Sequence, residues 1–269
     1  MKNNKIIVVL NSKGGASKST TSMQIASAYF LDKNVEITLY EIDKKNEDNL
    51  VFKETEIETK QITIENDGID AVEKIKGITN NPDEKNNIVI DVGGNLTTEL
   101  VIDALRKSRM YRKIDLFIIP MSGGGADLKN AISTYEEILE FHPDAQFLFV
   151  LSRVRREARV KLQFDEFFDN EISKKFKYII FEDSDTIDLS RKVGKSVYEI
   201  ATDTDTKKSL EEAFDNSLDV DDNEKIDLFS ELLSIYDESI IYLNSNLKPA
   251  FKILDSALKI EDETQKDKR

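Results

Sequence analysis

The chain has 269 residues, a formal net charge of −14 and no cysteine. This length suits one sizeable α/β core with an appendage. The lack of cysteine excludes disulfides and thiolate metal sites, and no stretch approaches the ~18 consecutive apolar residues of a membrane-spanning helix. Residues 1–5 lead into an apolar run too short for a secretory signal, so we expect a cytoplasmic protein. The acidic balance argues against nucleic-acid binding by the whole surface, leaves room for one basic patch and favours basic partners.

Apolar, β-branched runs alternate with helix-periodic segments over about the first 180 residues. The expected strands cover residues 6–10, 35–42, 87–92, 114–120, 146–151 and 178–181, with a short edge strand at 61–64. The expected helices cover residues 20–30, 68–78, 97–110 and 126–141. Strands that alternate with helices predict a doubly wound, mainly parallel sheet with helices on both faces.

The composition changes near residue 202. Acidic residues dominate 203–224, and a helical apolar period follows over 226–243. Pro249 interrupts this period, which resumes over 251–260. We expect one or two amphipathic helices there, followed by a frayed polar end.

The sequence therefore predicts an α/β domain over residues 1–215. Residues 216–269 are predicted to form an acidic and amphipathic helical extension, packed on the core or at an oligomer face.

A glycine-rich segment joins the first expected strand to the first expected helix. Glycines let backbone N–H groups wrap phosphates at a helix N-terminus, while Lys18 suits the β- and γ-phosphates and the Ser19 hydroxyl suits Mg²⁺. The strict P-loop pattern has glycine where this chain has Ser12 and Ser17, which leaves open a plain Gly/Ser turn. A serine forced to positive φ at position 17 costs about 1 kcal/mol or more. The expected nucleotide-binding loop is Lys13, Gly14, Gly15, Ala16, Ser17, Lys18, Ser19 and Thr20.

The extra lysine at the start of this loop, Lys13, makes it resemble the deviant Walker A loop of the ParA/MinD family of ATPases. The resemblance covers roughly residues 5–215 and implies a P-loop NTPase-like fold that binds ATP or ADP with Mg²⁺. It also implies an ATP-dependent sandwich homodimer, in which Lys13 contacts the phosphates bound to the partner. Slow intrinsic ATP hydrolysis is expected, with Lys13, Lys18 and Asp43 as catalytic residues.

Two acids end expected strands. Glu41-Ile42-Asp43 resembles the family's Asp-x-Asp segment, in which the second acid positions water and the magnesium shell. Asp91 ends an apolar strand as a Walker B acid does and is followed by Gly93-Gly94. The implied magnesium residues are Ser19, Asp43 and Asp91. The alternative for Glu41-Ile42-Asp43 is a solvated strand end.

Two later segments also follow the family's order. Ser152 stands where the family has an asparagine that contacts adenine, so it is an expected nucleotide-binding residue with uncertain base specificity. Residues 185–197 resemble the loop that closes over the base.

One dense basic run stands out in the acidic chain. Partition ATPases of the resembled family bind DNA non-specifically through basic residues, some in this part of the chain, and arginine suits phosphate contacts. The alternative is a solvated helix face paired with Glu157 and nearby acids. The candidate DNA-binding residues are Arg153, Arg155, Arg156, Arg159 and Arg191.

The leading hypothesis is a ParA-like ATPase that partitions plasmid or chromosomal DNA, with hydrolysis stimulated by a ParB-like, centromere-binding adaptor that carries a basic segment. Such a protein would be nucleoid-associated when it binds DNA. The alternative is a related ATPase without direct DNA binding, acting as a plasmid stability or transfer accessory or a positioning switch. A third possibility is a metabolic P-loop enzyme. Acids interspersed among the lysines of the tail argue against membrane targeting, and the sequence names neither partner nor cargo.

Overall fold

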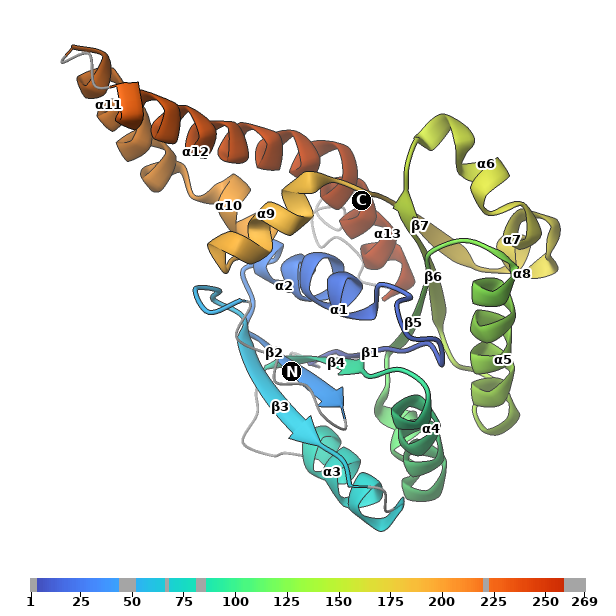
Figure 1. Ribbon diagram of the computed structural model, residues 1–269. Coiled ribbons are helices and arrows are strands. Elements are labelled where there is room, and N and C mark those ends of the chain that lie inside the picture. The colour runs from blue at the N-terminus through green and yellow to red at the C-terminus, as the bar shows by residue number, and fades with distance from the viewer. Residues whose placement is uncertain (1–3, 44–51, 66–67, 81–85, 220–222, 259–269) are drawn as a thin grey trace, which may run out of the picture. The chain divides into compact units, whose positions relative to one another are not determined.

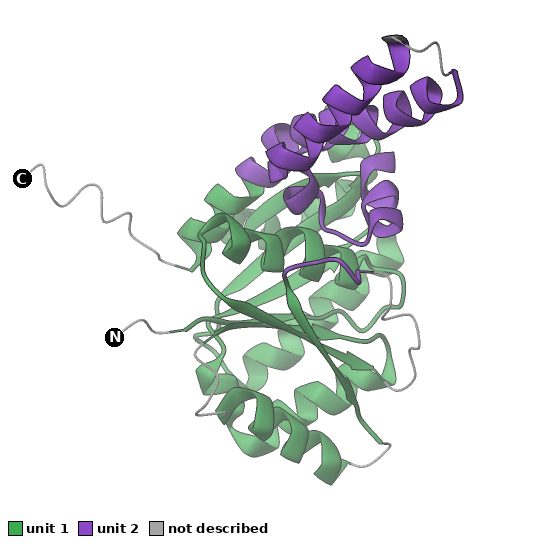
Figure 2. Cartoon of the chain, turned by 90° about the vertical axis from the view of Figure 1, so that its left-hand side faces the viewer, with its two compact units in different colours: residues 1–47, 57–183, 250–269 green, residues 48–56, 184–249 purple. Residues whose placement is uncertain are grey.

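The computed structural model describes residues 4–43, 52–65, 68–80, 86–219 and 223–258. Lys44-Lys45, which follow Asp43 where the resembled family has Pro-Gln, lie outside these residues, as does the polar end expected to fray. The chain divides into two compact units, coloured separately in Figure 2. The first comprises residues 1–47, 57–183 and 250–269, and the second residues 48–56 and 184–249.

The first unit is built on a seven-stranded sheet with the order β3-β2-β4-β1-β5-β6-β7, in which every pairing is parallel. This confirms the predicted α/β fold. Central strands such as Ile6–Val9 are buried throughout, as expected for a run covered on both faces. The strands are β1 (Ile6–Val9), β2 (Ile37–Asp43), β3 (Glu58–Thr63), β4 (Asn87–Val92), β5 (Leu116–Met121), β6 (Phe147–Val154) and β7 (Lys177–Glu182).

Helices cover both faces of this sheet, as predicted. Figure 1 shows α1 and α2 on one face and α3 and α4 on the other. On the second face, Ile75 and Val101 join Val8 in one buried core. The helical segments of this unit are α1 (Lys18–Thr21), the π-helical η1 (Ser22–Ser27), α2 (Ala28–Asp32), α3 (Gly68–Asn80), α4 (Leu96–Ser108), the 3-10 turn η2 (Met110–Lys113), α5 (Gly125–Phe141), the 3-10 turn η3 (Glu157–Arg159), α6 (Val160–Gln163), α7 (Asp165–Asp169), α8 (Glu171–Lys175) and α13 (Lys248–Ala257) from residue 250.

Two strands extend three residues beyond a predicted end. β3 begins at Glu58 rather than at residue 61, because an edge strand with mostly exposed side chains has little apolar signal. β6 runs to Val154 with an irregular register against β7 after Leu151, so Ser152 and Arg153 belong to this strand.

Helices make up most of the described part of the second unit. It contains α9 (Asp185–Val193), α10 (Val197–Thr202), α11 (Thr204–Asp219), α12 (Asn223–Tyr242) and the π-helical η4 (Leu243–Leu247), which leads into α13. The segment 185–197, expected as a loop, is mostly helix α9. Its ends carry local signals: Ser184 accepts from the Thr186 N–H, and Gly194 is left-handed at the C-cap.

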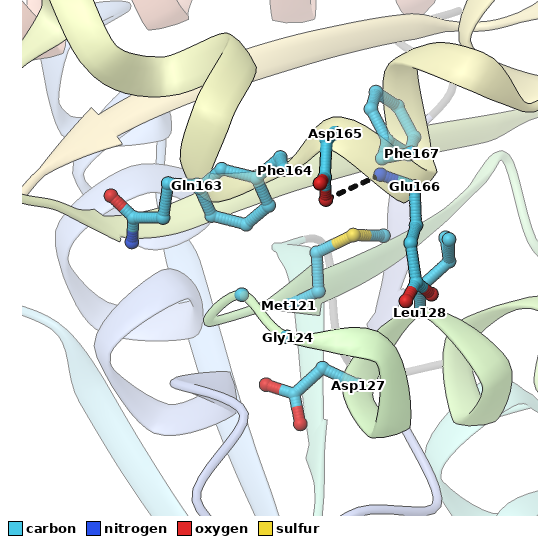
Figure 3. A pocket seen from close by; sticks show the side chains of 10 residues that line it. Met121, Gly124, Asp127, Leu128, Gln163, Phe164, Asp165, Glu166 and Phe167 are labelled. Carbon is cyan, nitrogen blue, oxygen red and sulfur yellow. Dashed lines mark hydrogen bonds between the residues drawn. The ribbon is translucent and has the colours of Figure 1, made fainter.

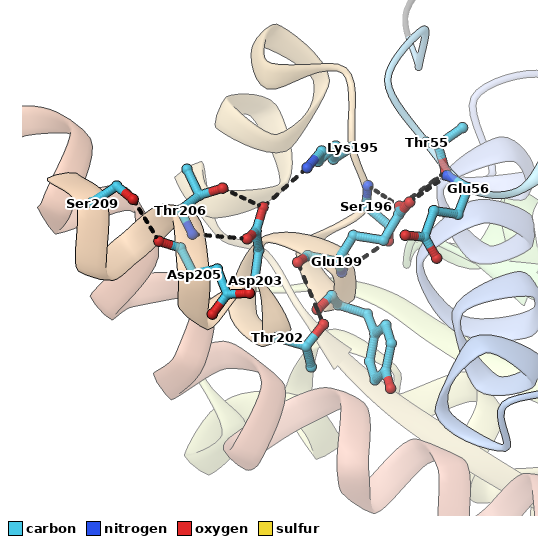
Figure 4. Close-up of polar contacts among 11 residues, drawn as sticks. Thr55, Glu56, Lys195, Ser196, Glu199, Thr202, Asp203, Asp205, Thr206 and Ser209 are labelled. Atoms are coloured by element: carbon cyan, nitrogen blue, oxygen red, sulfur yellow. Dashed lines mark hydrogen bonds and ion pairs between the residues drawn. The ribbon is translucent and has the colours of Figure 1, made fainter.

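Glu199 organises this second unit (Figure 4). Its buried carboxylate accepts from the backbone N–H groups of Ser196 at 2.8 Å and Glu56 at 2.6 Å, and from the hydroxyls of Thr55 and Ser196. Through these bonds one side chain caps α10 and holds the segment around residues 55 and 56, which is 143 positions away in sequence.

The C-terminal part of the chain differs in detail from the expectation. Pro249 does not end the helical run: it follows the π-helical η4 as the second residue of α13. A π-helical turn changes the i−4 hydrogen-bond pattern that a proline cannot complete. Farther along α13, Asp255 accepts from the Tyr29 hydroxyl at 2.7 Å, and Phe251 packs edge-on against the Tyr29 ring. The division into compact units therefore does not follow the boundary at residue 215, which falls inside α11. No helix in the described part of the chain has the length and apolar character needed to cross a bilayer.

Candidate functional site

The loop after β1 has the backbone shape of a phosphate cradle. Gly15 has φ +77° and Ser17 has φ +63°, and α1 begins directly after Ser17. The position that the strict pattern gives to glycine is therefore left-handed, and the serine is strained there. Lys18 is buried and turns back to donate to the Lys13 carbonyl at 2.9 Å. A loop of this form directs backbone N–H groups and one lysine towards a bound anion.

Two asparagines hold the loop in place, and the sequence analysis did not identify either. The buried Asn11 side chain donates to the Pro120 carbonyl at 2.8 Å and accepts from the Lys13 N–H at 2.9 Å. Asn95, at φ +50°, donates its backbone N–H to the Ser12 carbonyl at 2.7 Å. The loop is thus attached to the ends of β5 and β4.

Lys18 interacts electrostatically with the two predicted acids, Asp91 and Asp43. Burial lowers the pKa of Lys18, while the nearby Asp91 and Asp43 carboxylates act in the opposite direction. Burial raises the pKa of Asp91, and a hydrogen bond with the Ser19 side chain opposes that rise. The structure therefore brings Lys18, Ser19, Asp43 and Asp91 together at one place.

The glycine pair after β4 explains how these groups approach one another so closely. A Cβ on Gly93 would lie 2.8 Å from the Asp43 Oδ1 atom, and one on Gly94 would lie 3.1 Å from the Gly14 Cα. The same added Cβ on Gly94 would lie 3.4 Å from the Lys18 Nζ atom. Any larger residue here would push the second strand end and the phosphate loop apart.

The residues present fit a magnesium ion that is shared with a phosphate ligand. Asp91 Oδ1 is buried and has no hydrogen-bond partner among the described residues. Those residues contain no cluster of three acidic or histidine side chains that would hold a metal by themselves. Mg²⁺ is normally held by one or two carboxylates together with phosphates and water. Asp91 and the Ser19 hydroxyl match that pattern.

Glu41 lies beside this acid centre. Its backbone pairs in register with Asp91 across β2 and β4. Burial, with the neighbouring Asp91 carboxylate, raises the pKa of Glu41 to about 7. Near neutral pH this side chain is therefore partly protonated, unlike an ordinary solvated strand end.

Lys13 has a partner that the sequence analysis missed. Its ammonium group forms an ion pair with Asp127, in the first turn of α5. The Asp127 carboxylate is 1% exposed and accepts from the Ser122 N–H at 3.1 Å and the Ser122 hydroxyl at 2.6 Å. Figure 3 shows the small pocket beside Asp127, which Met121 and Gln163 help to line. Only the fold brings Lys13 and Asp127 together, since 114 positions separate them.

The predicted adenine-contacting residue is already engaged. Ser152 is buried, and its hydroxyl donates to the Met121 carbonyl at 2.9 Å. Its role towards a base stays a prediction.

The candidate DNA-binding arginines do not form one group. Arg155, Arg156 and Arg159 are exposed and make no ion pair among the described residues, so pairing with Glu157 is not seen. Arg153 instead hydrogen-bonds Ser17 of the phosphate loop. Arg191 lies in the second unit and pairs with Asp188.

Solved structures with a similar fold include the MinD cell division protein of Aquifex aeolicus, at 14% identity and a TM-score of 0.54, covering 74% of this chain and 90% of that one. A plasmid partition protein of Borrelia burgdorferi bound to AMPPNP is 15% identical with a TM-score of 0.48, covering 71% and 90%. Cobyrinic acid a,c-diamide synthase of Mycobacterium smegmatis with ADP and magnesium is 12% identical with a TM-score of 0.45, covering 62% and 80%.

No family model and no curated protein matches the sequence. At these identities the likeness concerns the fold alone, and only the MinD comparison, with a TM-score above 0.5, carries weight. It confirms the predicted ParA/MinD resemblance as one of fold.

Proposed function

We propose that this protein is a magnesium-dependent ATPase of the ParA/MinD type. The observation that carries the proposal is the meeting of Lys18, Asp43 and Asp91 across the Gly93-Gly94 backbone. A structural turn between a strand and a helix has no need for a buried lysine beside two carboxylates. In a complex with a nucleoside triphosphate and Mg²⁺, the phosphates would neutralise the lysine and the metal ion would neutralise the carboxylates.

In this proposal each of these residues has a role in ATP hydrolysis. Backbone N–H groups of the loop hold the phosphates, and Lys18 neutralises charge that develops on the transferred group. The Ser19 hydroxyl and the Asp91 carboxylate would hold Mg²⁺, which when bound would supply Lewis-acid chemistry at the phosphates. Asp43, against Gly93, orients the attacking water. Slow intrinsic hydrolysis is expected, because these groups mainly position the water and neutralise charge.

The proposal includes an ATP-dependent homodimer in which Lys13 contacts the nucleotide bound by the partner. The ion pair of Lys13 with Asp127 gives this step a cost, because it must open before the lysine can reach another chain. Lys13 is partly exposed, with 38% of its side chain accessible, so water can stabilise the released ammonium group.

The test measures ATP hydrolysis and the oligomeric state by size-exclusion chromatography. Wild-type protein should bind MgATP, release phosphate slowly, stop when EDTA removes Mg²⁺, and elute as a dimer with MgATP. Asp43→Ala should bind MgATP, hydrolyse it at least about 100-fold more slowly and remain dimeric. Asp144→Ala, an exposed acid far along the chain, is the matched control. Wild type that binds no MgATP would reject the ATPase, and monomers in both forms would reject the dimer alone.

A DNA partition role is the finer part of the proposal. The exposed, unpaired side chains of Arg155, Arg156 and Arg159 favour it, since arginine without an acid partner is available to phosphate. We expect ATP-dependent DNA retention that weakens as salt rises and is lost in Arg156→Glu but kept in Arg112→Glu. ATPase activity without DNA retention would instead favour an accessory or positioning role. A basic segment of an adaptor would be the stimulating partner in either case.

A further inference from the structure

Arg153 is held in an unusual backbone conformation near the end of β6. Its φ is +54°, in a region that residues other than glycine rarely occupy. The Gln163 side chain fixes this turn, donating to the Arg153 carbonyl at 2.8 Å and accepting from the Arg155 N–H at 3.3 Å. The strain is thus maintained by specific bonds, which is typical of a position that serves a binding site.

This conformation directs the Arg153 side chain to the phosphate loop. Its Nε–H donates to the Ser17 hydroxyl at 3.2 Å. Ser17 is the residue directly before Lys18 and is itself left-handed, at φ +63°. Two strained residues from segments 136 positions apart therefore meet through one hydrogen bond.

The charge of Arg153 has no partner within the described chain. The guanidinium forms no ion pair there, and Ser17 occupies only one of its five N–H donors. A planar cation with free donors at the rim of a phosphate loop suits bidentate contact with phosphate oxygens.

We propose that Arg153 binds the phosphates of the nucleotide held by its own chain, and so is a nucleotide-binding residue rather than part of the DNA surface. This inference rests on the proposed ATPase function. It also gives Ser17 a role, since the serine hydroxyl holds the guanidinium in position where a glycine could not.

The experiment measures binding of MgATP, MgADP and magnesium tripolyphosphate to the full chain by calorimetry. Arg153→Ala should weaken binding of all three about tenfold or more, as loss of a charged hydrogen bond does, and Arg153→Lys should recover part of it. Arg153→Gly relaxes the backbone while removing the side chain, so a loss shared with Arg153→Ala belongs to the guanidinium. Arg112→Ala, an exposed arginine on η2, should bind as wild type does. Circular dichroism verifies that each variant is folded.

Unchanged MgATP affinity in Arg153→Ala, beside a wild type that binds normally, would overturn this inference and leave the ATPase intact. An Arg153→Ala variant that binds MgATP and MgADP more weakly, yet binds magnesium tripolyphosphate normally, would overturn it in favour of a contact with the nucleoside. Wild type that binds none of the three ligands would reject the ATPase itself, and this inference with it.

Discussion

The two compact units differ in where their backbone is strained. In the described residues, every position with positive φ lies in the first unit except Gly194, an ordinary left-handed C-cap of α9. Two of the first unit's positions, Asn34 and Arg109, follow helices. The others follow or end strands β1, β4, β5 and β6, and they are Gly15, Ser17, Asn95, Gly123, Gly124 and Arg153.

The difference indicates which unit carries the chemistry. At the carboxyl ends of parallel strands the chain must turn sharply and expose N–H groups, and strain there is kept because it shapes a binding site. In the second unit, α9 and α10 have standard helix caps, and the Glu199 carboxylate is part of the cap of α10. We therefore expect changes in the first unit to affect nucleotide binding, and changes in the second unit outside residues 185–197 to affect stability alone.

The largest effect is expected for Lys18→Met. It removes a buried cation that faces the phosphates, so MgATP affinity should fall about 100-fold or more, as for loss of a desolvated charge partner. Calorimetry measures the affinity. The matched control is Lys208→Met, an exposed lysine of α11 in the second unit, which should bind MgATP normally. Equal losses of affinity in both variants would contradict the assignment of nucleotide binding to the first unit.

Glu199→Ala tests the second unit. The change leaves the backbone N–H groups of Ser196 and Glu56 without their carboxylate acceptor, so the free energy of unfolding should fall by about 2–4 kcal/mol. Urea denaturation followed by circular dichroism measures this loss. In the control, Glu212→Ala at an exposed position, the free energy of unfolding should hardly change. MgATP affinity should not change, and a parallel loss of affinity would show that the two units act together.

Asp127→Asn should have an intermediate effect on stability. It removes the buried acid partner of Lys13 but keeps a side chain of the same shape that can still accept from Ser122. Because Lys13 is partly exposed and can be solvated, we expect a loss of about 1–2 kcal/mol rather than the full penalty of an unpaired buried charge. Thermal unfolding measures it against Asp144→Asn. A gain in stability would mean that the ion pair costs more to bury than it contributes.

The smallest effect concerns the pH dependence at Glu41. Its pKa is raised to about 7 in the folded protein, from an ordinary value near 4.5 in the unfolded chain. The folded state therefore holds this proton more tightly, so the contribution to stability is greatest below pH 4.5 and is lost as pH rises through 7.

Glu41→Gln should accordingly stabilise the metal-free protein at pH 8 by about 1 kcal/mol, after allowance for partial exposure, and have little effect at pH 4. Melting temperatures at the two pH values test this, with exposed Glu36→Gln as the control. A gain of equal size at both pH values would contradict the assignment of the shift to Glu41.

Much of the first unit could be predicted because its signals are local. A buried strand such as Ile6–Val9 has an apolar run wherever it lies, and Lys13, Lys18 and Ser19 mark a phosphate loop by their spacing alone. β3 was harder, because an exposed edge strand carries little apolar signal. The helix α9 was expected as a loop because of the family resemblance, although its residues are amphipathic. The signals at Ser184 and Gly194 were nonetheless present in the sequence.

The sequence by itself determined the parallel α/β fold, the phosphate loop and the acids at the ends of β2 and β4, since each depends on residue type and spacing along the chain. Only the tertiary structure decided that Asp127 pairs with Lys13, and that Arg153 turns to Ser17 instead of joining the exposed arginines. Those contacts join segments more than 100 positions apart, and they depend on the order of the strands in the sheet. The second contact also depends on the positive φ angle of Arg153, which cannot be predicted from the residue type. Ser17, a departure from the glycine pattern in sequence, has its reason in that fold.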